Sequence, residues 1–120
     1  MARRASKNKP VKAPVMDTVE RIISERIEKT KQLILVKGKE YVRGNDRLHN
    51  FRRASEMERT TMPRALHGML QKHLVSYLDM LDDIDAGKEV KEEVVNEKLG
   101  DIIVYFLLQE ATIKETIKNK

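Results

Sequence analysis

The chain has 120 residues, of which 36% are charged and 40% hydrophobic, and it carries a net charge of +5. This length fits one domain with its own core, and the absence of cysteine excludes disulfides and thiolate metal sites. No apolar run follows Arg3 and Arg4, so no signal peptide is predicted, and the longest apolar run, 102–108, is too short to cross a bilayer. We therefore expect a cytoplasmic protein without a membrane partner.

The basic character is concentrated at the N-terminus. Residues 1–14 contain five lysines and arginines and no acid, so residues 15–120 sum to zero. Such a segment predicts a flexible basic tail. It either is simply solvated or binds nucleic acid nonspecifically, and we expect no other contact with nucleic acid.

Apolar residues recur at helical spacing in the rest of the chain and predict an all-α, four-helix bundle-like fold in a single domain, 15–120. The helices are expected at about 17–37, 47–58, 62–86 and 90–117. The last two are apolar around much of their circumference, which is typical of helices packed against several others. The excess apolar surface also predicts a homo-oligomer, with a compact monomer as the alternative.

Capping residues indicate where two of these helices begin and end. Asp17 or Thr18 is expected to cap the first helix, and Gly38 to end it. Thr60 or Thr61 is expected to cap the third.

The polar segment 38–51 interrupts the helical pattern and is rich in turn-forming residues. Loops of this polarity are candidate ligand contacts. Asn45, Asp46 and Asn50 either contact the base or sugar of a nucleotide, or shape a turn and cap the second helix. The sequence leaves both interpretations open.

Carboxylates on the two long helices are the strongest candidates for chemistry. Asp79 lies on the third helix, and Glu97 and Asp101 lie four residues apart on the fourth. Acids beside apolar runs are costly to bury unless they are paired or bind a cation. If the two faces meet, the three carboxylates would suit Mg²⁺, which binds phosphate oxygens on its other side. Lys72 and Lys98 lie beside them and are candidate phosphate ligands.

A network of ion pairs explains the same residues without a ligand. Lys72 and Lys98 could simply neutralise Asp79 and Asp101. His73 shares the apolar stripe of the third helix, where a histidine is more often a hydrogen-bonded core residue than a ligand. If a nucleotide binds here, His73 is a candidate contact.

Three pieces of the sequence together resemble a known family. They are KEYVRGNDRLHNF (39–51), ALHGMLQKHLVSYLDML (65–81) and NEKLGDIIVYFLLQEA (96–111), in this order. They resemble the phage and bacterial nucleotide modification associated domain family, which looks like a divergent relative of the all-α nucleoside triphosphate pyrophosphatases, the MazG and dimeric dUTPase group. The residues that carry the resemblance are Tyr41, Asp46, Asn50, Phe51, Gly68, Met69, Lys72, His73, Asp79, Glu97, Lys98, Gly100 and Asp101.

The resemblance implies a nucleotide-binding protein, and a Mg²⁺-dependent phosphohydrolase if the acids suffice. Those pyrophosphatases hold magnesium with Glu-x-x-Glu on one helix and Glu-x-x-Asp on another. Here the motifs align with Ser76-x-x-Asp79 and Lys98-x-x-Asp101, so two of the four acids are replaced. A lysine could replace the charge of a cation and leave binding without turnover. The alternative is a non-enzymatic, oligomeric interaction protein, encoded by a phage, whose acids form only structural ion pairs.

Overall fold

The computed structural model describes residues 13–41 and 43–120, and every regular element in them is a helix. The helices are α1 (Ala13–Tyr41), α2 (His49–Glu58), α3 (Met62–Asp85) and α4 (Glu92–Lys118). The prediction of an all-α fold with four helices is therefore confirmed. The expected basic tail lies outside the described residues except for positions 13 and 14, which belong to α1. No described helix is both long and apolar enough to span a bilayer.

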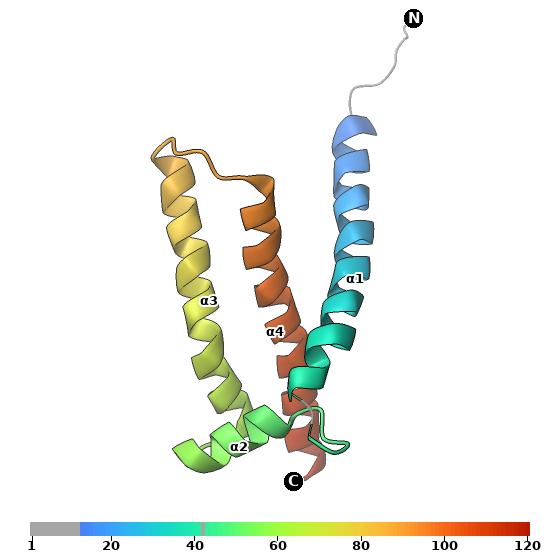
Figure 1. Ribbon diagram of the computed structural model, residues 1–120, viewed down its shortest axis with the longest axis vertical. Coiled ribbons are helices and arrows are strands. Elements are labelled where there is room, and N and C mark those ends of the chain that lie inside the picture. Colours follow the sequence, from blue (N-terminus) through green and yellow to red (C-terminus); the bar gives the residue numbers. More distant parts are fainter. Residues whose placement is uncertain (1–12, 42) are drawn as a thin grey trace, which may run out of the picture.

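α3 and α4 form an antiparallel hairpin, and α4 lies between α3 and α1 (Figure 1). α1 runs in the same direction as α4, and their separation widens toward the N-terminal end of α1 (Figure 1). α2 crosses the hairpin at the end away from the connection between α3 and α4, and it packs on α3 (Figure 1). The three long helices thus form a single layer closed at one end by α2.

The boundaries of α1 differ from the prediction at both ends. The helix begins at Ala13 with Pro14 in its first turn, so Asp17 and Thr18 lie inside it and the expected N-cap is wrong. It also continues through Gly38 to Tyr41, so the expected end at Gly38 is wrong. A glycine inside a helix costs about 1 kcal/mol relative to alanine, and the hydrogen bonds of a helix that is already formed can offset that cost.

The junction between α2 and α3 is a tight pair of caps. Arg59 ends α2 in the left-handed region with φ of 56°, and the next amide, that of Thr60, donates to the carbonyl of Ser55 at 2.9 Å. Thr61 then begins α3, and its hydroxyl accepts a hydrogen bond from the amide of Arg64 at 3.3 Å. The prediction of a threonine cap here is confirmed for Thr61.

The core lies at the end of the hairpin that α2 closes. Phe51 of α2 and Leu66 of α3 are 1% and 0% exposed. Farther along α3, Val75 and Leu78 are 57% and 54% exposed, so the expectation that this helix is buried on most sides is wrong for them in the single chain. The buried cluster consists of Leu48, Phe51, Met62, Leu66 and Leu70.

Candidate functional site

The seam between α3 and α4 brings together several residues that the sequence singled out. The ammonium of Lys98 on α4 donates to the hydroxyl of Ser76 on α3. One turn closer to the α2 end of the hairpin, Nδ1 of His73 lies 3.7 Å from Oδ2 of Asp101. That distance is too long for a hydrogen bond but close enough for electrostatic attraction if the imidazole is protonated. We call these four residues the hairpin seam.

An aromatic contact extends the seam toward the core. The ring of His73 lies 4.7 Å from the ring of Tyr105, centre to centre, at an interplanar angle of 41°. His73 is 30% exposed in its side chain, so it is neither a fully buried core histidine nor a freely solvated one. Together with Tyr105, the hairpin seam therefore combines an ammonium, a carboxylate, a hydroxyl and two rings on a partly exposed surface.

The predicted carboxylate ligands lie along this hairpin but do not form a cluster in the single chain. Asp79 and Glu97 are exposed, and Asp101 is partly buried beside His73. Among the described residues, no three histidine, aspartate or glutamate side chains come together in a way that could hold a metal ion. A magnesium site at Asp79, Glu97 and Asp101 remains a prediction. Lys72, the other predicted phosphate ligand, is exposed on α3.

The polar segment before α2 is organised by Arg52. The guanidinium of Arg52 donates to both carboxylate oxygens of Asp46, at 2.8 and 3.1 Å, and to Oε2 of Glu115 on α4 at 2.6 Å. Oδ1 of Asp46 also accepts from the amide of Leu48 at 3.0 Å. Asp46 thus shapes the turn that leads into α2, which is one of the two roles that the sequence allowed. We call Asp46, Arg52 and Glu115 the Arg52 clamp.

Electrostatics within the Arg52 clamp favour the charged forms. The hydrogen bond from Arg52 is the main cause that lowers the pKa of Asp46, and the amide of Leu48 adds to it. The two carboxylates raise the pKa of Arg52, principally through the bond to Asp46. That Arg52 bridges two elements was not predictable from the sequence, because its partner Glu115 is 63 residues away in the chain.

The Arg52 clamp and the hairpin seam are well separated along α4. Glu115 follows Asp101 by 14 positions on the same helix, which correspond to about 21 Å at a rise of 1.5 Å per residue. Asn45 and Asn50 are exposed near the Arg52 clamp. The structure therefore does not bring the predicted nucleotide contacts Asn45, Asp46 and Asn50 beside the acids of the same chain, and their role in binding stays a prediction.

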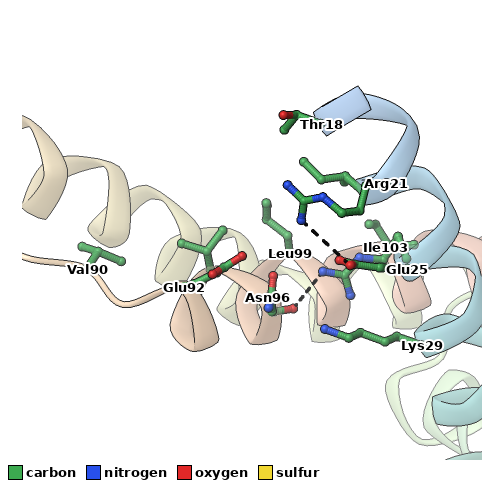
Figure 2. A pocket seen from close by; sticks show the side chains of 12 residues that line it. Thr18, Arg21, Glu25, Lys29, Val90, Glu92, Asn96, Leu99 and Ile103 are labelled. Carbon is green, nitrogen blue, oxygen red and sulfur yellow. Dashed lines mark hydrogen bonds and ion pairs between the residues drawn. The ribbon is translucent and has the colours of Figure 1, made fainter. Parts of the chain in front are cut away.

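A cleft between α1 and α4 is a feature that the sequence did not predict. It has a volume of about 490 Å³ and mixes apolar walls with charged side chains (Figure 2). Nη2 of Arg26 on α1 donates to the backbone carbonyl of Asn96 at 3.3 Å, where the two helices approach. Gly100 makes room for this contact, because a Cβ there would lie 2.7 Å from Nη1 of Arg26. A glycine on the face of α4 that meets α1 is the signal that could have located it.

The fold and the hairpin seam define an all-α protein with a mixed polar surface on a helical hairpin. Comparison with known protein families, with curated proteins and with solved structures found no match to the chain. The function is therefore argued from the residues of the chain and from the resemblance of its motifs.

Proposed function

We propose that the chain is a nucleotide-binding protein of the all-α nucleoside triphosphate pyrophosphatase type, acting in phage or bacterial nucleotide metabolism. The observation that carries this proposal is the contact between Lys98 and Ser76. The resemblance implies acids at both positions, and the two residues that depart from it lie against each other across the hairpin. The serine and the lysine that replace the two acids thus contact each other where the resemblance would place a cation.

Charge explains how such a pair can favour a phosphate. Two acids that hold Mg²⁺ present the positive charge of the metal to a phosphate, whereas Lys98 presents its own ammonium at the same place. Lys72 precedes Ser76 by four residues, so it lies on the same face of α3, one turn away. These two lysines would hold the phosphates, and the rings of His73 and Tyr105 would lie beside the sugar or base.

Two carboxylates remain for a metal ion that arrives with the nucleotide. Glu97 and Asp101 are four residues apart on α4 and share a face of the helix. Mg²⁺ commonly binds through one or two carboxylates, keeps several waters and takes its other ligands from the phosphates. A site of this kind needs no cluster of three side chains before the nucleotide binds. When bound, the ion would neutralise the phosphates, while Lys98 stands where a further carboxylate would be needed for rapid hydrolysis.

The segment 45–50 would take part only under a further condition. The segment meets α4 through Arg52 at Glu115, about 20 Å along the helix from Asp101. It would therefore reach a nucleotide at the hairpin seam only from a second copy of the chain or through a long ligand. The primary contacts proposed are therefore Lys72, His73, Lys98 and Asp101.

A second candidate is a non-enzymatic, homo-oligomeric interaction protein. The exposed apolar side chains of α3 and α4, among them Leu78, Phe106 and Ile117, favour it. In that case the hairpin seam only joins two helices, and the acids serve the fold. The two candidates differ in whether any nucleotide stabilises the native state.

Thermal unfolding with and without Mg²⁺, in the presence of each common ribo- and deoxyribonucleoside triphosphate, tests the proposal. A nucleotide at 100 times its dissociation constant should stabilise the protein by about 2.7 kcal/mol. We expect Lys98→Ala to abolish this shift and Asp101→Asn to abolish the part that depends on Mg²⁺. Lys114→Ala, which removes an exposed lysine of the same helix, is the matched control and should keep the full shift. If no nucleotide changes the melting temperature of the wild-type protein in Mg²⁺, the second candidate takes the place of the first.

A further inference from the structure

α1 is attached to the rest of the molecule along only part of its length. Arg26 contacts α4 at Asn96 and Gly100, and one turn later Thr30 is 7% exposed. Toward the N-terminal end, α1 diverges from α4 and the cleft opens between them (Figures 1 and 2). The N-terminal half of α1 is therefore supported on one side at most.

That half carries an apolar stripe that the rest of the described chain leaves about half exposed. Val19, Ile22, Ile23 and Ile27 recur at the spacing of one helix face and are 50–58% exposed. We call these four residues the α1 stripe. An isolated helix is only marginally stable in water, and most of its stability in a protein comes from packing of its apolar face. A stripe of this length on a helix that projects from the body therefore needs a cover.

The shape of the cleft beside the α1 stripe suits the binding of a helix. Its apolar walls come from both helices, with Ile22 from α1 and Val95, Leu99 and Ile103 from α4. It is open along one side rather than closed around a small ligand, and Figure 2 shows the charged side chains of Arg21, Glu25 and Lys29 projecting from α1 beside it. The apolar surface continues along α4 with Phe106 and Leu107, which are 54% and 44% exposed.

We propose that a second copy of this chain covers this surface, with the two α1 stripes packed antiparallel about a two-fold axis near Ile23. Each α1 then lies over the cleft of the other copy, so that α1 and α4 of both copies form one four-helix core. This surface is centred on α1 and shares only the exposed residues Phe106 and Leu107 with the third and fourth helices, whose excess apolar surface predicted an oligomer.

The charges of α1 select a second copy over an anionic ligand. Residues 17–31 contain four acids and four bases and sum to zero, so two such surfaces do not repel each other. The acids Asp17 and Glu20 precede the stripe and the bases Lys29 and Lys31 follow it, so an antiparallel arrangement places opposite charges near each other and a parallel one places like charges together. Within the cleft, Glu25 and Glu92 accompany the basic residues and would oppose an anion.

The available area is sufficient for a stable dimer. Six apolar side chains take part, the α1 stripe together with Phe106 and Leu107, and each exposes at least 44% of its surface. At roughly 100 Å² each, with the flanking polar residues added, one copy offers on the order of 800 Å², which is the per-partner size of a standard interface. This association does not rest on nucleotide binding.

Light scattering coupled to size-exclusion chromatography of the full chain tests the association. At about 100 μM we expect a mass of twice 14.0 kDa for the wild type. Ile23→Glu places two unpaired charges at the axis and should weaken the dimer by at least about 100-fold, giving a monomer. Met57→Glu changes an apolar residue of α2 that is 79% exposed and lies outside the surface, so this control should remain dimeric. A monomeric wild type, or a dimeric Ile23→Glu, would overturn the proposal.

Cysteine crosslinking tests the orientation and does not depend on a destabilising variant. The chain has no cysteine, so single substitutions report directly on proximity. Ile23→Cys, at the axis, should form a disulfide-linked dimer on mild oxidation, whereas Val19→Cys should not, because in an antiparallel pair it lies about 12 Å along the helix from its own copy. Crosslinking of Val19→Cys alone would indicate a parallel pair and refute the arrangement. Crosslinking of neither would refute the surface. Stabilisation of a monomeric wild type by inorganic phosphate would instead assign the cleft to an anion.

Discussion

At the residue scale, two buried threonines show opposite hydrogen-bonding states. Oγ1 of Thr30 on α1 has no partner among the described residues, although the residue is 7% exposed. Thr112 on α4 is fully buried, and its hydroxyl contacts the backbone carbonyl of Gln109 at 3.0 Å and the side-chain oxygen of the same residue at 2.6 Å. Because the two threonines are similarly buried, comparing them shows what a hydrogen-bonded hydroxyl contributes to stability.

We predict opposite effects of the same isosteric change at these two positions. Thr30→Val removes a hydroxyl that is buried without a partner, so it should raise the free energy of unfolding by about 1 kcal/mol. Thr112→Val removes a satisfied hydroxyl and leaves Gln109 short of a partner, so it should lower that free energy by about 1 kcal/mol. Urea unfolding followed by circular dichroism measures both. Equal changes of the same sign would contradict the assigned contacts.

Residue roles were predictable from the sequence where they are local. Thr61 could be identified as a cap because its partner, the amide of Arg64, is three residues away. The contact between Lys98 and Ser76 spans 22 residues, and spacing alone places each on a helix face without saying that the faces meet. For the same reason, spacing alone did not predict the hydrogen bond from Arg52 to Glu115.

At the element scale, the Arg52 clamp joins the segment before α2 to the last turns of α4. The lowered pKa of Asp46 makes this connection sensitive to acid. A carboxylate with a depressed folded pKa contributes stability that is present above its unfolded value, near 3.8, and is lost as the pH falls through the folded value. Acidification below about pH 4 should therefore lower the free energy of unfolding.

We predict that Asp46→Asn flattens this acid dependence. The variant should be less stable than the wild type near pH 6, by about 1 kcal/mol because both partners are a third exposed and solvent screens the pair. The difference should shrink as the pH falls to about 2.5, since the wild-type carboxylate is then protonated. Thermal unfolding across this range measures it, with the exposed Asp82→Asn as control. A gap between wild type and Asp46→Asn that stays constant with pH would exclude the Arg52 clamp as its source.

The existence and order of the helices were predictable, and their ends less so. Helical spacing of apolar residues identified all four elements, and the predicted limits of α2 and α3 lie within two residues of those observed. For α1 the signals of Asp17 and Gly38 were misleading, because capping and glycine preferences amount to about 1 kcal/mol each and a helix 29 residues long can override them.

At the scale of the whole molecule, the apolar pattern predicts which face of a helix is buried but not what buries it. On α3, Leu66 and Leu70 meet the core, whereas Val75 and Leu78 on the same helix remain exposed. On α1, the α1 stripe is only about half covered. A sequence therefore shows how much apolar surface a chain carries, while the structure shows which part of it the chain cannot cover alone.

This uncovered surface leads to a prediction about the stability of the entire molecule. If folding is coupled to association, unfolding produces two chains from one dimer, and the melting temperature must rise with protein concentration. A tenfold increase contributes about 1.4 kcal/mol and should raise the melting temperature by about 3 °C for an assembly of this size. Scanning calorimetry from about 10 to 100 μM measures the shift. Ile23→Glu should melt lower and at a temperature independent of concentration, whereas Met57→Glu should follow the wild type. A wild-type melting temperature that does not change over this range would mean that the layer of three long helices is stable by itself, and that the α1 stripe contributes nothing to folding.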